Sequence, residues 1–138
     1  MEIKCYNTLP LEAVEIRKAV FIEEQGFQNE FDDIDTYAAH LVMFDNNSPI
    51  ATCRFYQEQG SDCYIIGRIA VIKNYRGQNI GTELMKEVEK IVRERKGDYI
   101  ALHAQLRARR FYEKQGYLSY GEMDYDEDCP HIWMRKKI

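Results

Sequence analysis

The sequence has no excess of positive charge. Its 138 residues include 19 Lys and Arg against 23 Asp and Glu, so the formal net charge is −4 with His neutral. Proteins that bind nucleic acid broadly present a basic surface to the phosphates, and this balance argues against such a partner. Hydrophobic residues make up 45% and charged residues 30%, which is typical of a folded chain that buries a core.

Long apolar runs are also missing. No stretch approaches the about 18 apolar residues that a membrane-spanning helix needs. The N-terminus, Met1 to Cys5, has no apolar signal-peptide core. We therefore expect a cytoplasmic protein with no membrane partner.

The four cysteines include no C-x-x-C pair; they are Cys5, Cys53, Cys63 and Cys129. In a reducing compartment they are expected to be core or surface thiols without disulfides. A nucleophilic cysteine is the alternative. His40, His103 and His131 have no metal-ligand spacing to the cysteines or to one another, so we expect no metal site.

Common nucleotide and calcium motifs are absent as well. There is no G-x-G-x-x-G, and the P-loop spacing fails because three residues separate Gly77 from Gly81 and no lysine precedes Thr82. Asp124-x-Asp126-x-Asp128 starts like a calcium loop, but Cys129 stands where Gly is required and Arg135 where Glu is required.

Hydrophobic periodicity and turn residues predict a single α+β domain over residues 1–138. Strands are expected at 1–6, 40–44, 50–56, 64–71, 99–104, 117–120 and 132–135, with helices at 8–21, 82–95 and 107–115 and an acidic loop at 124–128. The residues between 64 and 104 form a βαβ unit, so these two strands should be parallel with a right-handed crossover. The rest of the mixed sheet should be mostly antiparallel, with helices flanking it.

A loop containing glycine, Tyr75 to Gly81, separates the strand at 64–71 from the following helix. Such a loop suits an anion because the first N–H groups of a helix are unpaired and its dipole adds partial positive charge. Within it, Arg76-x-x-Asn79-x-Gly81 resembles the acyl-CoA signature of the GNAT family of N-acetyltransferases, Arg/Gln-x-x-Gly-x-Gly/Ala. Asn79 departs from the family's glycine, but Asn tolerates left-handed geometry, so the loop should keep its shape.

A second segment, residues 108–117, resembles the family's other signature, Ala-x-x-Phe-Tyr-x-x-x-Gly-Phe/Tyr, on the next helix. The remainder of the chain is similar to the small ElaA-like branch of the family. That similarity rests on Arg17-x-x-Val20-Phe21-x-x-Glu24-Gln25, Asp32-x-x-Asp35, Ala39-His40 and Pro130-His131-x-x-Met134.

The resemblance implies a GNAT-type fold and direct transfer of an acetyl group from acetyl-CoA to a primary amine in a ternary complex. It assigns the pyrophosphate to backbone N–H groups from Gln78 to Thr82, with the charge of Arg76 nearby, and the thioester carbonyl to backbone N–H groups around Ile69 to Val71. The expected cofactor-binding residues are Ile69, Ala70, Val71, Arg76, Gly77, Gln78, Asn79, Ile80, Gly81, Thr82, Ala108 and Phe111.

The resemblance also makes Tyr112 the general acid that protonates the departing thiolate; the alternative for Tyr112 is simple aromatic packing beside Phe111. A base is needed for the incoming amine. The sequence leaves this base open, with Glu23 or Glu24, His40 and His131 as candidates and deprotonation by solvent as an alternative.

Six carboxylates between residues 23 and 35 leave two interpretations open. They form either a solvated loop or an acidic wall that attracts a cationic small-molecule amine or a basic peptide. The rival to an enzyme is a non-catalytic acyl-CoA-binding or sensing domain, and a phosphate-binding module without CoA is a third possibility. A homodimer is also possible.

Overall fold

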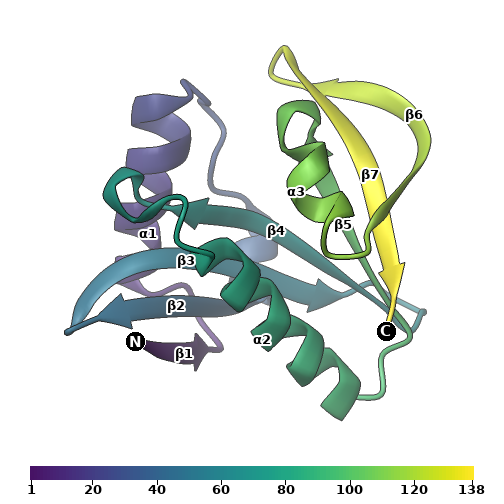
Figure 1. The fold of residues 1–138 in the computed structure, drawn as a ribbon, viewed down its shortest axis with the longest axis horizontal. Helices are drawn as coiled ribbons and strands as arrows, with labels where there is room; N and C mark the ends of the chain where they lie inside the picture. Colours follow the sequence, from purple (N-terminus) through teal and green to yellow (C-terminus); the bar gives the residue numbers. More distant parts are fainter.

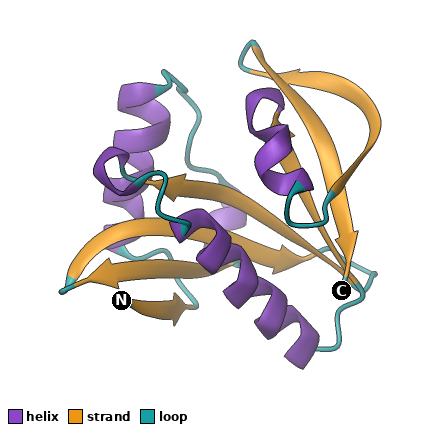
Figure 2. Cartoon of the chain, in the orientation of Figure 1, coloured by secondary structure: helices purple, strands orange, loops and turns teal.

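The computed structural model describes residues 1–138 and places seven strands in one sheet, in the order β1-β2-β3-β4-β5-β7-β6 (Figures 1 and 2). The strands are β1 (Glu2–Tyr6), β2 (Ala39–Asp45), β3 (Ser48–Gln57), β4 (Cys63–Val71), β5 (Tyr99–Gln105), β6 (Leu118–Asp126) and β7 (Cys129–Lys137). Only the β4–β5 pair is parallel. The predicted mostly antiparallel sheet with one βαβ unit is confirmed.

Three α-helices flank the sheet: α1 (Leu11–Arg17), α2 (Ile80–Glu94) and α3 (Arg109–Glu113). Shorter helical segments are the π-helical η1 (Lys18–Glu24) and the 3-10 turns η2 (Asp33–Thr36), η3 (Lys73–Tyr75) and η4 (Leu106–Ala108). The helix predicted at residues 8–21 is therefore α1 followed directly by the π-helical segment η1. None of the helices is both long enough and apolar enough to cross a membrane.

Both faces of the β1–β4 half of the sheet are covered, by α1 on one side and α2 on the other (Figure 1). Strand β2 shows why its sequence is apolar throughout: Leu41 and Met43 pack in the core that contains α2, while Val42 and Phe44 pack in the core that contains α1. Alternate residues of a strand point to opposite faces, so a strand covered on both faces buries all of them.

The β2–β3 hairpin turns at Asn46 and Asn47, which both have positive φ (48° and 70°). Two left-handed residues in succession match the twist of the flanking strands, and Asn tolerates that conformation better than other non-glycine residues. The hairpin predicted between residues 40 and 56 is thereby confirmed.

Strands β4 and β5 pair only at their first halves. The parallel register runs from Cys63 opposite Tyr99 to Ile66 opposite Leu102 and then stops. Beyond it the two strands diverge (Figure 1). A register irregularity against β3 accompanies the divergence, and Arg68 within it has a positive φ of 54°. The backbone of β4 from residue 67 onward thus has no partner strand on its β5 side.

The C-terminal part departs from the sequence prediction in two places. The helix expected at 107–115 is shorter, because residues 106–108 form a 3-10 turn. The acidic loop expected at 124–128 is wrong: Asp124 and Asp126 belong to β6, and the turn is only Glu127 and Asp128, both at positive φ. Strand β6 is an exposed edge strand along its whole length, so its carboxylates stay in solvent at no cost of burial.

Candidate active site

A cavity of about 860 Å³ occupies the region where β4 and β5 diverge. The end of η1, the second half of β4, the loop before α2, the segment from β5 to α3 and the β6–β7 hairpin all contribute to its lining. Its volume is in the range of sites that hold drug-sized ligands. We call the part formed by the loop, α2 and α3 the donor side, and the part formed by η1, the end of β5 and the β6–β7 hairpin the acceptor side.

The donor side is built on the predicted loop. Gly77 has φ 78°, and Asn79, the N-cap of α2, has φ 63° and ψ 17°, which is left-handed. The expectation that Asn79 keeps the geometry of a glycine is therefore confirmed. The backbone N–H groups of residues 77–82 donate to no acceptor within the chain. Six free donors at the N-terminus of a 15-residue helix are suited to an anion.

Gly81 has a steric role. A Cβ atom at this position would lie 3.0 Å from Cζ of Phe111, so any side chain here would have to displace the Phe111 ring. Phe111 is on α3 and also lines the cavity. The two sequence signatures thus meet in space at this contact.

Arg76 is bound to a carboxylate. Its Nη1 and Nη2 donate to Oε2 and Oε1 of Glu24 at 2.9 and 2.8 Å, and its Nε donates to the carbonyl oxygen of Val71 at 2.9 Å. The hydrogen bond from Arg76 lowers the pKa of Glu24, so this carboxylate holds a proton weakly. In this structure the charge of Arg76 is therefore directed at Glu24, and Glu24 is a poor candidate for a base.

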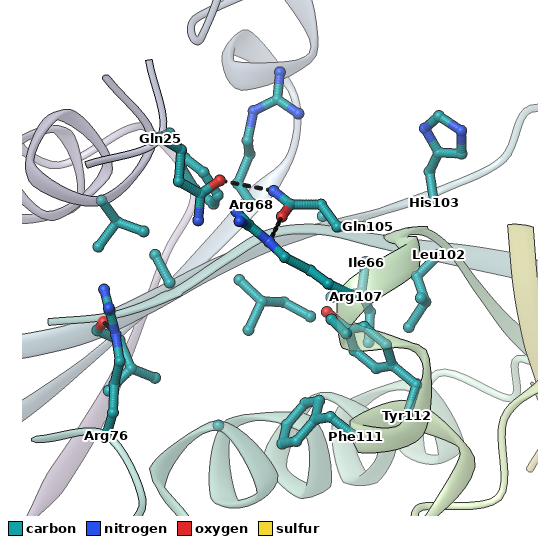
Figure 3. Close-up of a pocket in the computed structure, with 18 of the residues that line it drawn as sticks. Gln25, Ile66, Arg68, Arg76, Leu102, His103, Gln105, Arg107, Phe111 and Tyr112 are labelled. Carbon is teal, nitrogen blue, oxygen red and sulfur yellow. Dashed lines mark hydrogen bonds between the residues drawn. The ribbon is translucent and has the colours of Figure 1, made fainter. Parts of the chain in front are cut away.

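Tyr112 lies at the junction of the two sides. Its side chain is buried, its hydroxyl forms no hydrogen bond with the protein, and the residue lines the cavity. Figure 3 shows the hydroxyl directed into the cavity beside Arg107. Burial raises the pKa of Tyr112, so the hydroxyl carries its proton at neutral pH.

The acceptor side contains two stacked imidazole rings. His131 Nδ1 lies 2.8 Å from the carbonyl oxygen of Cys129. Because a carbonyl only accepts, this nitrogen carries a proton, and Nε2 of the neutral ring is left as an acceptor. The ring stacks on His103 at 4.6 Å between centroids, and His103 Nε2 in turn lies 2.7 Å from Oδ1 of Asp124.

Two other base candidates lie elsewhere. Neither His40 nor Glu23 lines the cavity. His40 is buried, its Nε2 donates to the carbonyl oxygen of Asp35 at 3.1 Å, and burial lowers its pKa. We assign His40 a structural role.

Three of the six carboxylates of the acidic segment, Glu30, Asp32 and Asp35, pair with arginines, and Glu30 and Asp35 are buried. Arg17 is 1% exposed; its Nε donates to Glu30 Oε2 at 2.8 Å and its Nη1 to Asp35 Oδ1 at 2.7 Å. The full set, which we call the ion-pair cluster, consists of Arg17, Arg54, Arg68, Glu30, Asp32 and Asp35. Three cations balance three carboxylates. These three carboxylates are therefore partners of buried arginines and not part of an open acidic wall. Glu24 pairs with Arg76, which leaves only Glu23 and Asp33 exposed and unpaired.

All but one of the expected cofactor-binding residues line the cavity, together with Tyr112, Glu24 and His131. The exception is Gln78, whose exposed side chain donates to the carbonyl oxygen of Asn74 at 3.4 Å. Sequence reasoning did not find several polar residues of the lining, among them Gln25, Arg68, His103, Gln105 and Arg107. They come from three separate segments, and only the placement of Gln25 beside Glu24 in the ElaA-like pattern hinted at one of them.

The sequence model of the Acetyltransferase (GNAT) family matches residues 7–117. An inferred acetyltransferase of Bacillus subtilis (strain 168) is 36% identical over 136 residues, which cover 91% of this chain and 87% of the relative. The crystal structure of Escherichia coli ElaA has a TM-score of 0.87 at 26% identity over 98% of both chains. An aminoglycoside 6'-N-acetyltransferase complexed with coenzyme A shares the fold, with a TM-score of 0.76 at 19% identity over 99% of this chain and 97% of that one.

The fold and the cavity are those of an acyltransferase. The chain belongs to the GNAT acetyltransferase family, and ElaA is among its relatives. The described residues include no cluster of three or more His, Cys, Asp or Glu side chains placed to hold a metal ion.

Proposed function

We propose that residues 1–138 act as one GNAT domain that transfers an acetyl group from acetyl-CoA directly to a primary amine. The acceptor is a small molecule or a peptide amine. The observation that carries this proposal is the run of six unpaired N–H groups at residues 77–82 in the same cavity as the hydroxyl of Tyr112. A phosphate seat and a proton donor that share one cavity are what thioester chemistry on a nucleotide carrier requires.

The residues present fit acetyl-CoA. Residues 77–82 offer their N–H groups to the pyrophosphate, while Ala108 and Phe111 provide apolar surface beside it. The unpaired backbone of β4 at residues 69–71 is available to the thioester arm and its carbonyl. A preorganised N–H donor at a carbonyl that gains negative charge is worth about 3 kcal/mol of barrier. Acetyl-CoA itself supplies an activated acetyl group.

Tyr112 is proposed as the general acid. The amine nitrogen forms a bond to the acetyl carbon, the carbon–sulfur bond breaks, and the hydroxyl donates its proton to the departing sulfur. The raised pKa of Tyr112 keeps this proton in place until the thiolate forms. The hydroxyl is directed into the cavity, where it is free to make that contact (Figure 3).

His131 is the base that the geometry supports best. Its Nδ1–H is held by the Cys129 carbonyl, so the acceptor nitrogen is Nε2, and the residue lines the acceptor side. Glu24 is a weaker candidate because it is paired with Arg76 at 2.8 Å, which lowers its pKa. A neutral imidazole accepts a proton near neutral pH, which a paired carboxylate does not do readily.

Direct transfer is favoured over an acetylated enzyme because no cysteine lines the cavity. Cys53 is fully buried, and burial raises its pKa, so its thiolate is disfavoured. The other three cysteines also lie outside the lining. The cavity therefore offers no thiol to carry the acetyl group.

The test is release of CoA thiol from acetyl-CoA in the presence of a panel of amines, with mass spectrometry of the amine product. The proposal predicts amine-dependent thiol release and an acetylated amine. A non-catalytic acyl-CoA-binding domain would bind acetyl-CoA but release no thiol with any amine. A phosphate-binding module would not distinguish acetyl-CoA from inorganic pyrophosphate in competition.

A further inference from the structure

Some of the arginine and lysine residues that line the cavity are paired with carboxylates, and others are not. Arg68 pairs with Glu30 at 2.9 Å, and Arg76 pairs with Glu24 at 2.8 Å. Arg107 and Lys114 are the remaining arginine and lysine residues of the lining, and neither has a carboxylate within 4.0 Å.

These two free cations belong to different sides of the cavity. Lys114 is the C-cap of α3, the donor-side helix that carries Phe111 next to Gly81. The guanidinium of Arg107 instead reaches the end of β5, next to the bridge between Gln105 and Gln25, and lies across the cavity from Arg76 (Figure 3). Arg107 is therefore the free cation of the acceptor side.

Two glutamines hold Arg107 in place. Its Nε donates to Oε1 of Gln105 at 2.8 Å, and Nε2 of Gln105 donates to Oε1 of Gln25 at 2.7 Å (Figure 3). Gln25 is the C-cap of η1 and Gln105 is the last residue of β5, so the chain of hydrogen bonds joins two elements 80 residues apart. The Nη atoms of Arg107 form no hydrogen bond with the protein and remain available.

A fixed guanidinium with free Nη donors is matched to a carboxylate, which it can bind through two parallel hydrogen bonds. Asp126 also lines this side without a cation within 4.0 Å. Its neighbour Glu127 accepts from the backbone N–H groups of Gln28 and Asn29 at 2.8 and 2.9 Å, which ties the β6–β7 turn to the segment after η1. The acceptor side thus presents one free charge of each sign, as a zwitterion requires.

We propose that Arg107 binds a carboxylate of the acceptor, so that the acceptor is an amino acid or another small amine bearing a carboxylate. Gln25 and Gln105 are positioning residues that orient the guanidinium. This inference rests on the proposed acetyl transfer and names its substrate class. It reverses the preference for a cationic substrate that the acidic segment suggested, because three of those carboxylates are bound within the ion-pair cluster and Glu24 is bound to Arg76.

The experiment compares each of several amino acids with its amide and its decarboxylated amine as acceptors, using kcat/KM at saturating acetyl-CoA. We expect the carboxylate form to exceed both partners at least about ten-fold. Arg107→Gln should abolish this preference by raising the acceptor KM while the dissociation constant of acetyl-CoA, measured by calorimetry, stays within two-fold. Arg110→Gln is the matched control, because Arg110 is exposed, unpaired and outside the lining.

Gln105→Ala tests the positioning role. It should raise the acceptor KM several-fold with little change in kcat, and Gln105→Glu, whose carboxylate would pair with the guanidinium of Arg107, should not restore the loss. Equal kcat/KM for amino acids and their amides in the wild-type enzyme would overturn the proposal. So would Arg107→Gln weakening acetyl-CoA and leaving the acceptor KM alone, because the guanidinium would then serve the donor phosphates. If no amine of any class is acetylated, the proposed function itself fails.

Discussion

The donor side and the acceptor side of the cavity are built in different ways. The donor side consists of the loop and N-terminus of α2 together with α3, and its chemistry is carried largely by the backbone N–H groups of the consecutive residues 77–82. The acceptor side joins segments as far apart as Gln25 and Gln105, or Gln28 and Glu127, through side chains. One side depends on local backbone geometry and the other on long-range packing.

This difference determines how strongly ligand recognition on each side depends on the identity of the side chains. Backbone donors at a helix N-terminus recognise a phosphate whatever the neighbouring side chains are, provided that the turn keeps its shape. Side chains from separate elements recognise an acceptor only when the fold brings them together. A shared donor and a family-wide diversity of acceptors follow naturally from such a division.

The largest effect is expected at the close contact of the donor side. Gly81→Glu should lower the affinity for acetyl-CoA more than 100-fold, because the new side chain meets Phe111 and brings a carboxylate to the phosphate seat. Calorimetry measures the affinity, and circular dichroism checks that the fold survives. Gln59→Glu, in the exposed β3–β4 turn, adds the same charge elsewhere and should bind normally. Retained binding in Gly81→Glu would move the pyrophosphate to another place.

A substitution in the ion-pair cluster should lower the free energy of unfolding, because the cluster is buried. Asp35→Asn leaves Arg17 and Arg54 without their shared carboxylate, and breaking such a buried pair costs about 3 kcal/mol. The measurement is the free energy of unfolding in urea at pH 7. Asp33→Asn is the control, because Asp33 is exposed and unpaired. A loss below about 1 kcal/mol would mean that the cluster is solvated.

The proposed base is tested by His131→Gln. Removing a positioned general base typically costs about 100-fold in turnover. The residual rate should rise with pH, because the acceptor amine then loses its proton to solvent. A rate within two-fold of wild type would transfer the role to solvent or to Glu24, which Glu24→Gln would then reveal.

Tyr112→Phe separates binding from chemistry. Turnover should fall at least about ten-fold while acetyl-CoA affinity changes little, since the ring that packs against Phe111 and Tyr117 is retained. The rate of CoA thiol release measures turnover, and calorimetry measures the affinity for acetyl-CoA. Unchanged turnover would reduce Tyr112 to an aromatic packing residue.

Acid should weaken the protein partly through Asp35. Burial alone would raise the pKa of this carboxyl, but hydrogen bonds and charges from Arg17 and Arg54 lower it from 3.8 to about 2. A depressed native pKa contributes stability that is complete above about pH 4 and is lost as the pH falls toward 2, an effect of about 2 kcal/mol. Burial raises the pKa of Glu30, so that residue acts in the opposite direction and offsets part of the loss.

The measurement is the free energy of unfolding as a function of pH between 5 and 2. Asp35→Asn should show a flatter dependence than the wild type over this range. Identical slopes would show that Asp35 is not held ionised by the two arginines.

The sequence was sufficient for the sheet, the βαβ unit and the donor side because these depend on short-range patterns. Asn79 at φ 63° is an example, since Asn is the residue expected where a left-handed conformation is needed without glycine. The ion-pair cluster was beyond the same reasoning. Six carboxylates in thirteen residues look solvated, but the fold brings Arg17, Arg54 and Arg68 from three other segments to three of them.

The acceptor side was inaccessible for the same physical reason. Gln25, Gln105 and Arg107 are ordinary residues in sequence and acquire a role only through a hydrogen-bond chain that spans the cavity. The acidic β6–β7 hairpin was also misleading, because an exposed edge strand tolerates the composition of a loop. Local patterns predicted the loop before α2, and tertiary contacts were needed to bring Gln25, Gln105 and Arg107 together.

Direct transfer between the two sides is tested most directly by initial-velocity kinetics in which acetyl-CoA and the acceptor amine are both varied. Direct transfer requires both substrates to be bound together, so the proposal predicts double-reciprocal plots with intersecting lines and no acetylation of the protein alone by acetyl-CoA. Parallel lines together with a stable acetylated protein would contradict the account.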